Sequence, residues 1–143
     1  MKLRTKDPWI SAPEYSKNLN GLMINLLVRN IVPATHFIKN VVKAKIIYED
    51  VDFCAVEGFG SNWCLHAAHT YEMHPFYNLI KTNEQRGVGV ELRLIGCNPD
   101  QAELNAKKYK YKILSKSENK AHGLRECFIE DTDGYCWVPS IKI

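Results

Sequence analysis

Several features that mark large classes of proteins are missing from this sequence of 143 residues. No segment approaches the roughly 20 consecutive apolar residues of a membrane-spanning helix, and residues 1–8 contain no apolar stretch typical of a secretion signal. The net charge is only +3, and no nucleic-acid-binding motif accompanies the modest lysine cluster at 107–120. These absences predict a cytoplasmic protein that has no membrane or nucleic-acid partner.

Motifs for several common chemistries are absent as well. The five cysteines show no CxxC or other zinc-binding spacing and fall mostly in apolar runs, which predicts buried, reduced thiols. The segment Gly87-Val88-Gly89 lacks the third glycine of a phosphate-binding loop and precedes a predicted strand instead of following one. No serine occupies a nucleophile elbow. Cys64 lies two residues before His66, but no residue is evident that would orient the imidazole for a cysteine nucleophile.

The most informative feature that is present is an internal repeat with a spacing of 66 residues. Ile24-Asn25-Leu26-Leu27-Val28 matches Val90-Glu91-Leu92-Arg93-Leu94 in character, and the same shift carries Pro33 onto Pro99. The repeat occurs only twice and is longer than a solenoid period, so it indicates a duplicated module. Two copies of one module commonly face each other across a pseudo-twofold axis, with a ligand between them.

Hydrophobicity and turn residues predict the same order of elements in both halves. Asn30 with Pro33, and Asn98 with Pro99, mark the starts of two helices. The predicted elements are a strand at 22–28, a helix at 33–42, strands at 45–49, 53–56, 62–67 and 88–95, a helix at 98–108, and strands at 111–114, 125–130 and 135–139. Each half is therefore βαβββ, and we predict an α+β fold.

The predicted elements also define the organisation of the chain. We expect a single domain at 21–140, made of modules at about 21–67 and 88–140 with a connector at 68–87. The polar residues 1–20 are interrupted by prolines and are expected to form an irregular arm. Trp9, Ile10 and Tyr15 are the residues expected to hold this arm against the body of the protein.

The end of the chain carries the most specific motif, Asp131-Thr132-Asp133-Gly134-Tyr135-Cys136-Trp137. Together with Asn25-Leu26-Leu27-Val28-Arg29-Asn30, Phe37-Ile38 and Val42-Lys43, it resembles the vicinal oxygen chelate superfamily of glyoxalases, bleomycin-resistance proteins and extradiol dioxygenases. The resemblance covers about residues 21–140. It implies that the two modules form a cupped, mostly antiparallel eight-stranded sheet, often within a homodimer, with a ligand bound in the cup.

The chain departs from the superfamily pattern at three positions of these motifs. Asn30 stands where an aspartate is common, Lys43 where a glycine is common, and Thr132 where a proline is common. None of these changes removes the predicted fold.

Metal-using members of the superfamily place their ligands on the first and last strands of the modules. The matching positions here are Met23, His66, Gly89 and Val138, of which only His66 can bind Zn²⁺, Ni²⁺, Mn²⁺ or Fe²⁺. A single imidazole does not hold a metal against water, so we predict no metal and no cofactor. A displaced site stays open as an alternative, in which Glu91 and His66 are joined by one more histidine. The candidates for that third ligand are His69, His74 and His122.

The alternation of side chains along strands indicates which residues face the cup. The residues predicted to bind a ligand are Asn25, Arg29, His66, Glu91, Arg93 and His122. Glu91 is also the tentative general base, because a carboxylate in such a pocket can have a raised pKa that suits proton abstraction. The alternative for Glu91 is a structural ion pair with Arg93, Arg29 or His66.

Three functions remain open from the sequence. The first is a metal-free protein, similar to bleomycin-resistance proteins, that binds a planar or cationic small molecule in the cup. The second is a glyoxalase-like lyase, isomerase or dioxygenase that uses a displaced metal site or Glu91 as the base. The third is a non-catalytic interaction subunit whose cup is filled by its own side chains.

Overall fold

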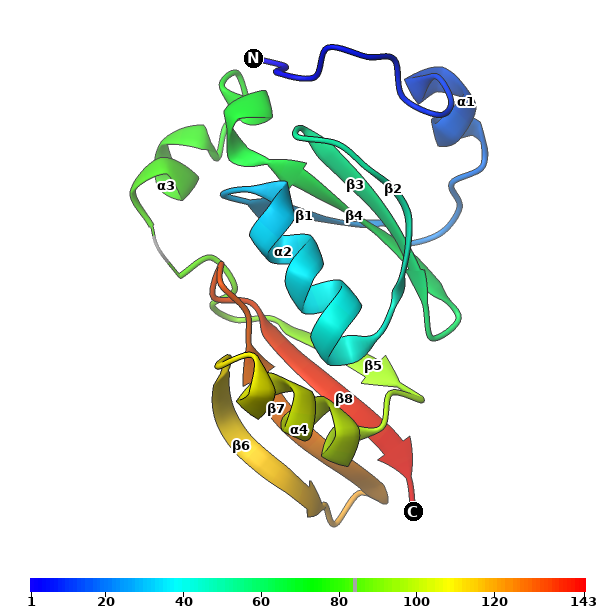
Figure 1. The fold of residues 1–143 in the computed structure, drawn as a ribbon, viewed down its shortest axis with the longest axis vertical. Coiled ribbons are helices and arrows are strands. Elements are labelled where there is room, and N and C mark those ends of the chain that lie inside the picture. Colours follow the sequence, from blue (N-terminus) through cyan, green and yellow to red (C-terminus); the bar gives the residue numbers. More distant parts are fainter. Residues whose placement is uncertain (84) are drawn as a thin grey trace.

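The two halves of the chain contain the same succession of one helix and four strands (Figure 1). This computed structural model describes residues 1–83 and 85–143. The N-terminal module consists of β1 (Ile24–Val28), α2 (Ile31–Phe37) continued by the π-helical turn η1 (Ile38–Val42), β2 (Lys45–Glu49), β3 (Phe53–Gly58) and β4 (Ser61–Ala67). The C-terminal module consists of β5 (Glu91–Ile95), α4 (Pro99–Lys108), β6 (Lys112–Asn119), β7 (Leu124–Glu130) and β8 (Cys136–Lys142).

Each module forms a four-stranded mixed sheet. The strand order is β1-β4-β3-β2 in the N-terminal sheet and β5-β8-β7-β6 in the C-terminal sheet. In each sheet the first and last strands of the module are parallel neighbours, whereas the other neighbours are antiparallel. The predicted α+β fold of two βαβββ modules is therefore confirmed, with the eight strands divided between two sheets.

Local sequence explains where the two long helices begin and end. The Asn98 side chain accepts a hydrogen bond from the N–H of Gln101, and Pro99 occupies the first turn of α4, where its missing N–H costs nothing. Asn30 precedes α2 in an extended conformation without a side-chain cap. Helix α2 ends after η1 at Lys43, whose φ of 61° is left-handed and stops the helix.

Three segments differ from the sequence-based expectation. The arm contains a short helix, α1 (Ala12–Lys17), because Ser11 and Glu14 form a capping box at its start. The connector contains the 3₁₀ turn η2 (Ala68–Tyr71) and helix α3 (Tyr77–Thr82). Strand β6 runs to Asn119, beyond the predicted end at 114, because its second half, residues 115–119, is entirely polar and carries no apolar signal of a strand.

One hydrophobic core joins the helix-facing sides of both sheets. The ring centroid of Trp63, in the N-terminal sheet, lies 5.9 Å from that of Trp137, in the C-terminal sheet. The ring centroid of Phe37, in α2, lies 5.7 Å from the same Trp137 centroid. Side chains alternate along a strand, so the other side of each sheet points away from this core. We call the side that faces away from the helix the cup face.

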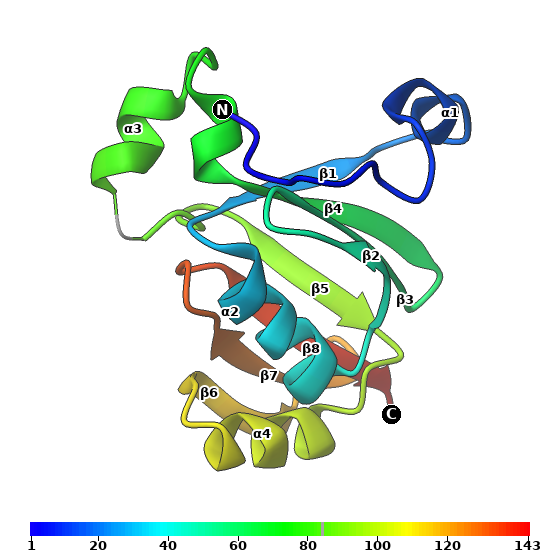
Figure 2. The ribbon, with the colours of Figure 1, turned by 45° about the horizontal axis from the view of Figure 1, so that its top comes forward.

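The N-terminal arm lies on the cup face of the N-terminal sheet (Figure 2). Trp9 and Tyr15 pack on this face, with Trp9 stacked on Tyr48 and Tyr15 edge-on to Phe53. Among the described residues, no helix has both the length and the hydropathy needed to cross a membrane.

Candidate ligand pocket

A cavity of about 300 Å³ separates the arm from the cup face of the N-terminal sheet. Trp9 and Tyr15 line it from the arm, and Phe53, Cys64 and His66 line it from β3 and β4. The volume lies at the lower end of the range that is typical of small-molecule sites. The space is therefore suited to a molecule of one or two rings.

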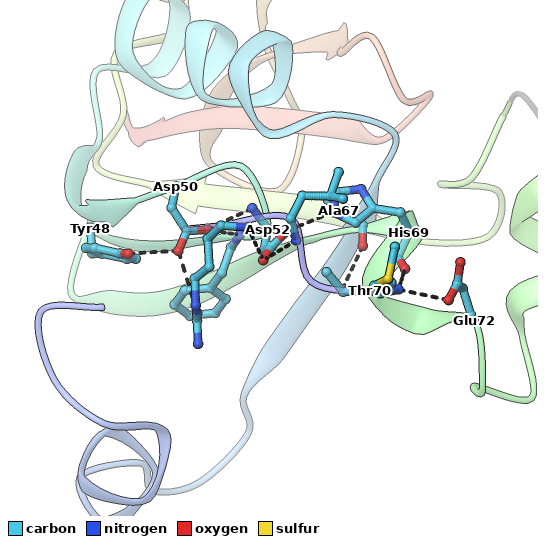
Figure 3. Close-up of polar contacts among 11 residues, drawn as sticks. Tyr48, Asp50, Asp52, Ala67, His69, Thr70 and Glu72 are labelled. Carbon is cyan, nitrogen blue, oxygen red and sulfur yellow. Dashed lines mark hydrogen bonds and ion pairs between the residues drawn. The ribbon is translucent and has the colours of Figure 1, made fainter. Parts of the chain in front are cut away.

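A buried carboxylate fixes the beginning of the arm to this face. Asp52, between β2 and β3, is 2% exposed and accepts hydrogen bonds from the N–H groups of Leu3 and Arg4 at 2.8 and 3.1 Å (Figure 3). His69 Nε2 lies 2.8 Å from the same carboxylate. Burial alone would raise the pKa of Asp52, but these hydrogen bonds outweigh it and hold the pKa below its usual value. Asp52 therefore joins the arm to the connector.

A second acidic residue, Asp50, strengthens the attachment of the arm. Its carboxylate accepts a hydrogen bond from the Tyr48 hydroxyl at 2.7 Å and lies 3.6 Å from the Arg4 guanidinium (Figure 3). It also accepts from the N–H groups of Asp52 and Phe53, which form a tight turn before β3. The same turn that presents Asp52 to the arm is thus held by Asp50.

Aromatic rings form the apolar part of the pocket. The Trp9 ring stacks on Tyr48 with centroids 4.5 Å apart and an interplanar angle of 23°, and its centroid lies 6.3 Å from that of Phe53. Tyr15 lies edge-on to Trp9 at 5.4 Å. Offset and edge-on pairs of this kind stabilise each other and present flat apolar surfaces. These rings give the cavity an apolar wall on the side of the arm.

The polar part of the pocket is a chain of three hydrogen-bonding side chains. His66 Nδ1 is hydrogen-bonded to Asn25 Oδ1, and Asn25 Nδ2 donates to the Tyr71 hydroxyl. The His66 ring also lies between Phe53, at 4.7 Å, and Tyr71, at 5.2 Å. Burial lowers the pKa of His66 to about 4, so the imidazole is neutral at pH 7.

Cys64 and Tyr15 close the pocket on its remaining side. The Tyr15 hydroxyl lies 3.1 Å from Cys64 Sγ. Burial raises the pKa values of both groups, so the thiol and the phenol are protonated at neutral pH. A protonated, buried thiol is a poor nucleophile.

Three of the predicted ligand-binding residues lie in another part of the molecule. Glu91, Arg93 and His122 are on the C-terminal module and do not line this pocket. Arg93 pairs with Glu91 at 3.2 Å and with the buried Glu126, and His122 Nε2 lies 3.4 Å from the Glu126 carboxylate. Glu91 therefore adopts the structural alternative, an ion pair with Arg93.

The sixth predicted residue, Arg29, holds the two modules together. Its backbone N–H donates a hydrogen bond to the Asp133 carboxylate at 2.8 Å, and its guanidinium donates one to the backbone carbonyl of Thr132 at 3.0 Å. Asp133 is 2% exposed and also lies 3.8 Å from the Arg86 guanidinium. The structure thus brings only Asn25 and His66, of the six predicted residues, into the cavity.

The residues at the positions of the superfamily's metal ligands do not fit a divalent ion. Met23, Gly89 and Val138 offer a thioether, a hydrogen and an isopropyl group, so His66 has no partner ligand among them. In the described ranges 1–83 and 85–143, no group of three or more His, Cys, Asp or Glu side chains is placed to hold a metal. His69 and His122 instead pair with Asp52 and Glu126.

The contribution of the arm to the pocket was not predicted. The presence of Trp9 and Tyr15 in an otherwise polar segment predicted that the arm packs on the body, but not where. The attachment depends on backbone N–H groups of Leu3 and Arg4, which donate to Asp52, 49 and 48 residues further along the chain. Contacts through backbone N–H groups cannot be predicted from the residue types of the arm, because every residue except proline has such a group.

Comparison with known structures agrees with this architecture. The sequence matches no protein-family model and no curated protein sequence. The fold is similar to that of a glyoxalase/bleomycin resistance protein/dioxygenase family enzyme from Burkholderia phytofirmans PsJN, with a TM-score of 0.68 and 15% identity over 85% of this chain and 97% of that one. It is also similar to a glyoxalase-related enzyme from Fulvimarina pelagi, with a TM-score of 0.68 and 10% identity over 86% and 88% of the two chains.

A resistance protein is among the similar structures. The fosfomycin resistance protein FosX from Listeria monocytogenes superimposes with a TM-score of 0.61 and 16% identity, over 87% of this chain and 95% of that one. The chain therefore has the glyoxalase/bleomycin-resistance/dioxygenase fold of the vicinal oxygen chelate superfamily, and the predicted resemblance is confirmed at the level of the fold.

Proposed function

We propose that this protein binds a small planar organic molecule in the pocket between its arm and the N-terminal sheet, without a divalent metal. The observation that carries the proposal is a cavity of about 300 Å³ with aromatic walls and a hydrogen-bonding group, His66, on one side. Small-molecule sites are commonly lined by apolar and aromatic side chains with a few polar groups that orient the ligand. The pocket differs from the predicted cup because one module and the arm line it.

The enzymatic alternatives have less support from the side chains. Glu91 is the tentative base, but Arg93 neutralises it on the C-terminal module, away from the cavity. A displaced metal site needs His66 and Glu91 together, and His66 is hydrogen-bonded to Asn25 instead. The third alternative, a filled cup, fits the cup face of the C-terminal sheet, where Arg93 and Glu126 meet, but not the hollow N-terminal face.

A titration of the isotope-labelled protein with a panel of one-ring and two-ring aromatic compounds tests the proposal. We expect saturable shifts in the NMR signals of Asn25, Cys64 and His66. A Glu91→Gln variant is the matched control and should bind the same compounds with unchanged affinity. Shifts confined to the C-terminal module, or no saturable binding by any compound, would contradict the proposal.

We also propose that two copies associate through the terminal strands of the sheets. Strands β1 and β5 each form one edge of their sheet, opposite β2 and β6, so one side of each has backbone groups without a neighbouring strand in its own sheet. Exposed apolar side chains flank both strands: Leu22 is 89% exposed and Val88 is 75% exposed. Exposed apolar residues at unpaired edges support association with a second chain.

The five free thiols support a reducing compartment such as the cytoplasm.

The mass of the protein in solution tests this assembly. Light scattering coupled to size-exclusion chromatography should give twice the mass of one chain, and Ile24→Lys with Val90→Lys should reduce it to that of one chain. A single-chain mass for the unaltered protein at concentrations of about 0.1 mM would contradict the homodimer.

A further inference from the structure

The hydrogen-bond chain at the polar end of the pocket has a defined direction. Asn25 donates through Nδ2 to Tyr71, so its carbonyl oxygen is the atom that meets His66. A carbonyl oxygen only accepts hydrogen bonds, so the proton of the neutral imidazole resides on Nδ1. The remaining ring nitrogen, Nε2, then has a free lone pair.

The environment of the ring leaves this nitrogen for a ligand. Phe53 and Tyr71 contact the imidazole, and Asn25 occupies Nδ1. Within residues 1–83 and 85–143, no side chain or backbone group forms a hydrogen bond with His66 Nε2. Because His66 lines the cavity, Nε2 is the ring atom that it offers to a bound molecule.

Charges around the pocket do not favour a cationic guest. Lys2 and Arg4 line the cavity, and burial is the main cause of the lowered pKa of His66. The charge of Asp50 opposes this lowering more than Lys2 adds to it, but Asp50 is paired with Arg4 at 3.6 Å. The lining carboxylate, Asp52, is already saturated by Leu3, Arg4 and His69. Glu91, the counter-charge expected from the sequence, is elsewhere. A neutral molecule is the better match.

We propose that the ligand is a neutral one-ring or two-ring aromatic compound with a hydroxyl or N–H group that donates a hydrogen bond to His66 Nε2. This inference rests on the proposed function and narrows it to one class of ligand. The rings of the ligand lie against the wall that Trp9, Tyr15 and Phe53 form together, and the donor points to β4. Asn25 and Tyr71 are positioning residues, since they act through the tautomer of His66.

A matched pair of probes tests the direction of this hydrogen bond. 2-Naphthol and 2-methoxynaphthalene share the same rings, but only 2-naphthol can donate. We expect 2-naphthol to bind roughly tenfold more tightly, because losing the donor leaves one hydrogen bond unmade in a partly dry pocket. Equal affinities, or tighter binding of the methoxy compound, would overturn the inference while the proposed function stands. If neither probe nor any other aromatic compound binds, both fail.

Variants and a direct measurement of the tautomer complete the test. His66→Phe keeps a flat ring and should reduce the preference for 2-naphthol to within twofold, with binding of 2-methoxynaphthalene retained. Should this variant not fold, the ¹⁵N chemical shifts of His66 in the unaltered protein still decide the matter. Protonated Nδ1 and unprotonated Nε2 are expected, and the opposite tautomer would overturn the inference.

Discussion

The cup faces of the two modules have equivalent backbones and opposite side-chain chemistry. Strand pairing places Asn25 beside Cys64 and Leu27 beside His66 in the N-terminal sheet. The equivalent pairs in the C-terminal sheet are Glu91 with Cys136 and Arg93 with Val138. The first set is neutral and leaves a hollow, whereas the second set is charged and includes its own ion pair.

The difference shows how duplication separates two roles. On the C-terminal face, Arg93 reaches the buried Glu126 and covers the middle of the sheet. On the N-terminal face, short or flat side chains leave room, and the arm covers that room without filling it. One cup face is thus closed by charge pairing, and the other borders a cavity.

The largest effect is expected from breaking the ion pair of the C-terminal face. Arg93→Met leaves Glu126, which is 2% exposed, without its cation and should lower the free energy of unfolding by about 3 kcal/mol. Urea unfolding measures this loss. The double variant Arg93→Met with Glu126→Met should recover most of it, because no unpaired charge stays buried. Affinity for 2-naphthol should not change in either folded protein, and a loss of binding would contradict the separation of roles.

A smaller loss of stability, but a larger loss of binding, is expected on the N-terminal face. Asp52→Ala removes the acceptor for Leu3, Arg4 and His69 and should lower the free energy of unfolding by about 2 kcal/mol. The arm should detach, which faster hydrogen exchange at the Leu3 and Arg4 amides would report. Glu72→Gln, which alters an exposed pair of the same arm, is the control and should cost less than about 0.5 kcal/mol. Intact binding in a folded Asp52→Ala protein would show that the arm is not a wall of the site.

Removing one ring of the wall should have a moderate effect. Trp9→Ala deletes the ring that stacks on Tyr48 and should weaken 2-naphthol binding roughly tenfold, while Trp9→Phe should stay within about threefold. Isothermal titration of both variants measures the difference. An alanine variant that binds as well as the phenylalanine variant would contradict a stacking role for Trp9.

The smallest effect on affinity is expected from a change of pH. Protonation turns His66 from an acceptor into a donor, but burial lowers its pKa to about 4. Affinity for 2-naphthol should therefore be flat between pH 8 and about pH 5.5 and should fall only as the pH approaches 4. A fall centred near pH 6.5, the usual value for histidine, would show that His66 is solvated and not held in the pocket.

Much of the fold was predictable because it depends on local patterns. Asn98 and Pro99 mark the start of α4, and apolar runs locate β1 and β4 within one or two residues. Helix α1 was missed because its capping box, Ser11 with Glu14, lies in a segment that Pro8 and Pro13 make look irregular. The short arm helix buries no residue, so no periodic apolar pattern marks it.

The candidate site was predictable only in part. Alternation along β1 and β4 correctly put Asn25 and His66 on one face. The same rule put Glu91 and Arg93 on the matching face of the other sheet, where they pair with each other. Alternation indicates the face of a sheet but not what covers it. The cover depends on the path of the arm, which long-range backbone contacts determine.

The thiol of Cys64 is a slow chemical reporter for the pocket, because burial keeps it protonated and alkylation needs long exposure to the reagent. Its sulfur lies against Tyr15 on the wall of the cavity, so an alkylating reagent has to enter the space that a guest would occupy. Cys136 is the equivalent residue of the other module, is half-buried, and lies outside that cavity. Peptide mass spectrometry gives the ratio of labelling at these two sulfurs. A bound molecule should slow the labelling of Cys64 but not that of Cys136, so the ratio reports how much of the pocket is occupied, with Cys136 as the internal standard.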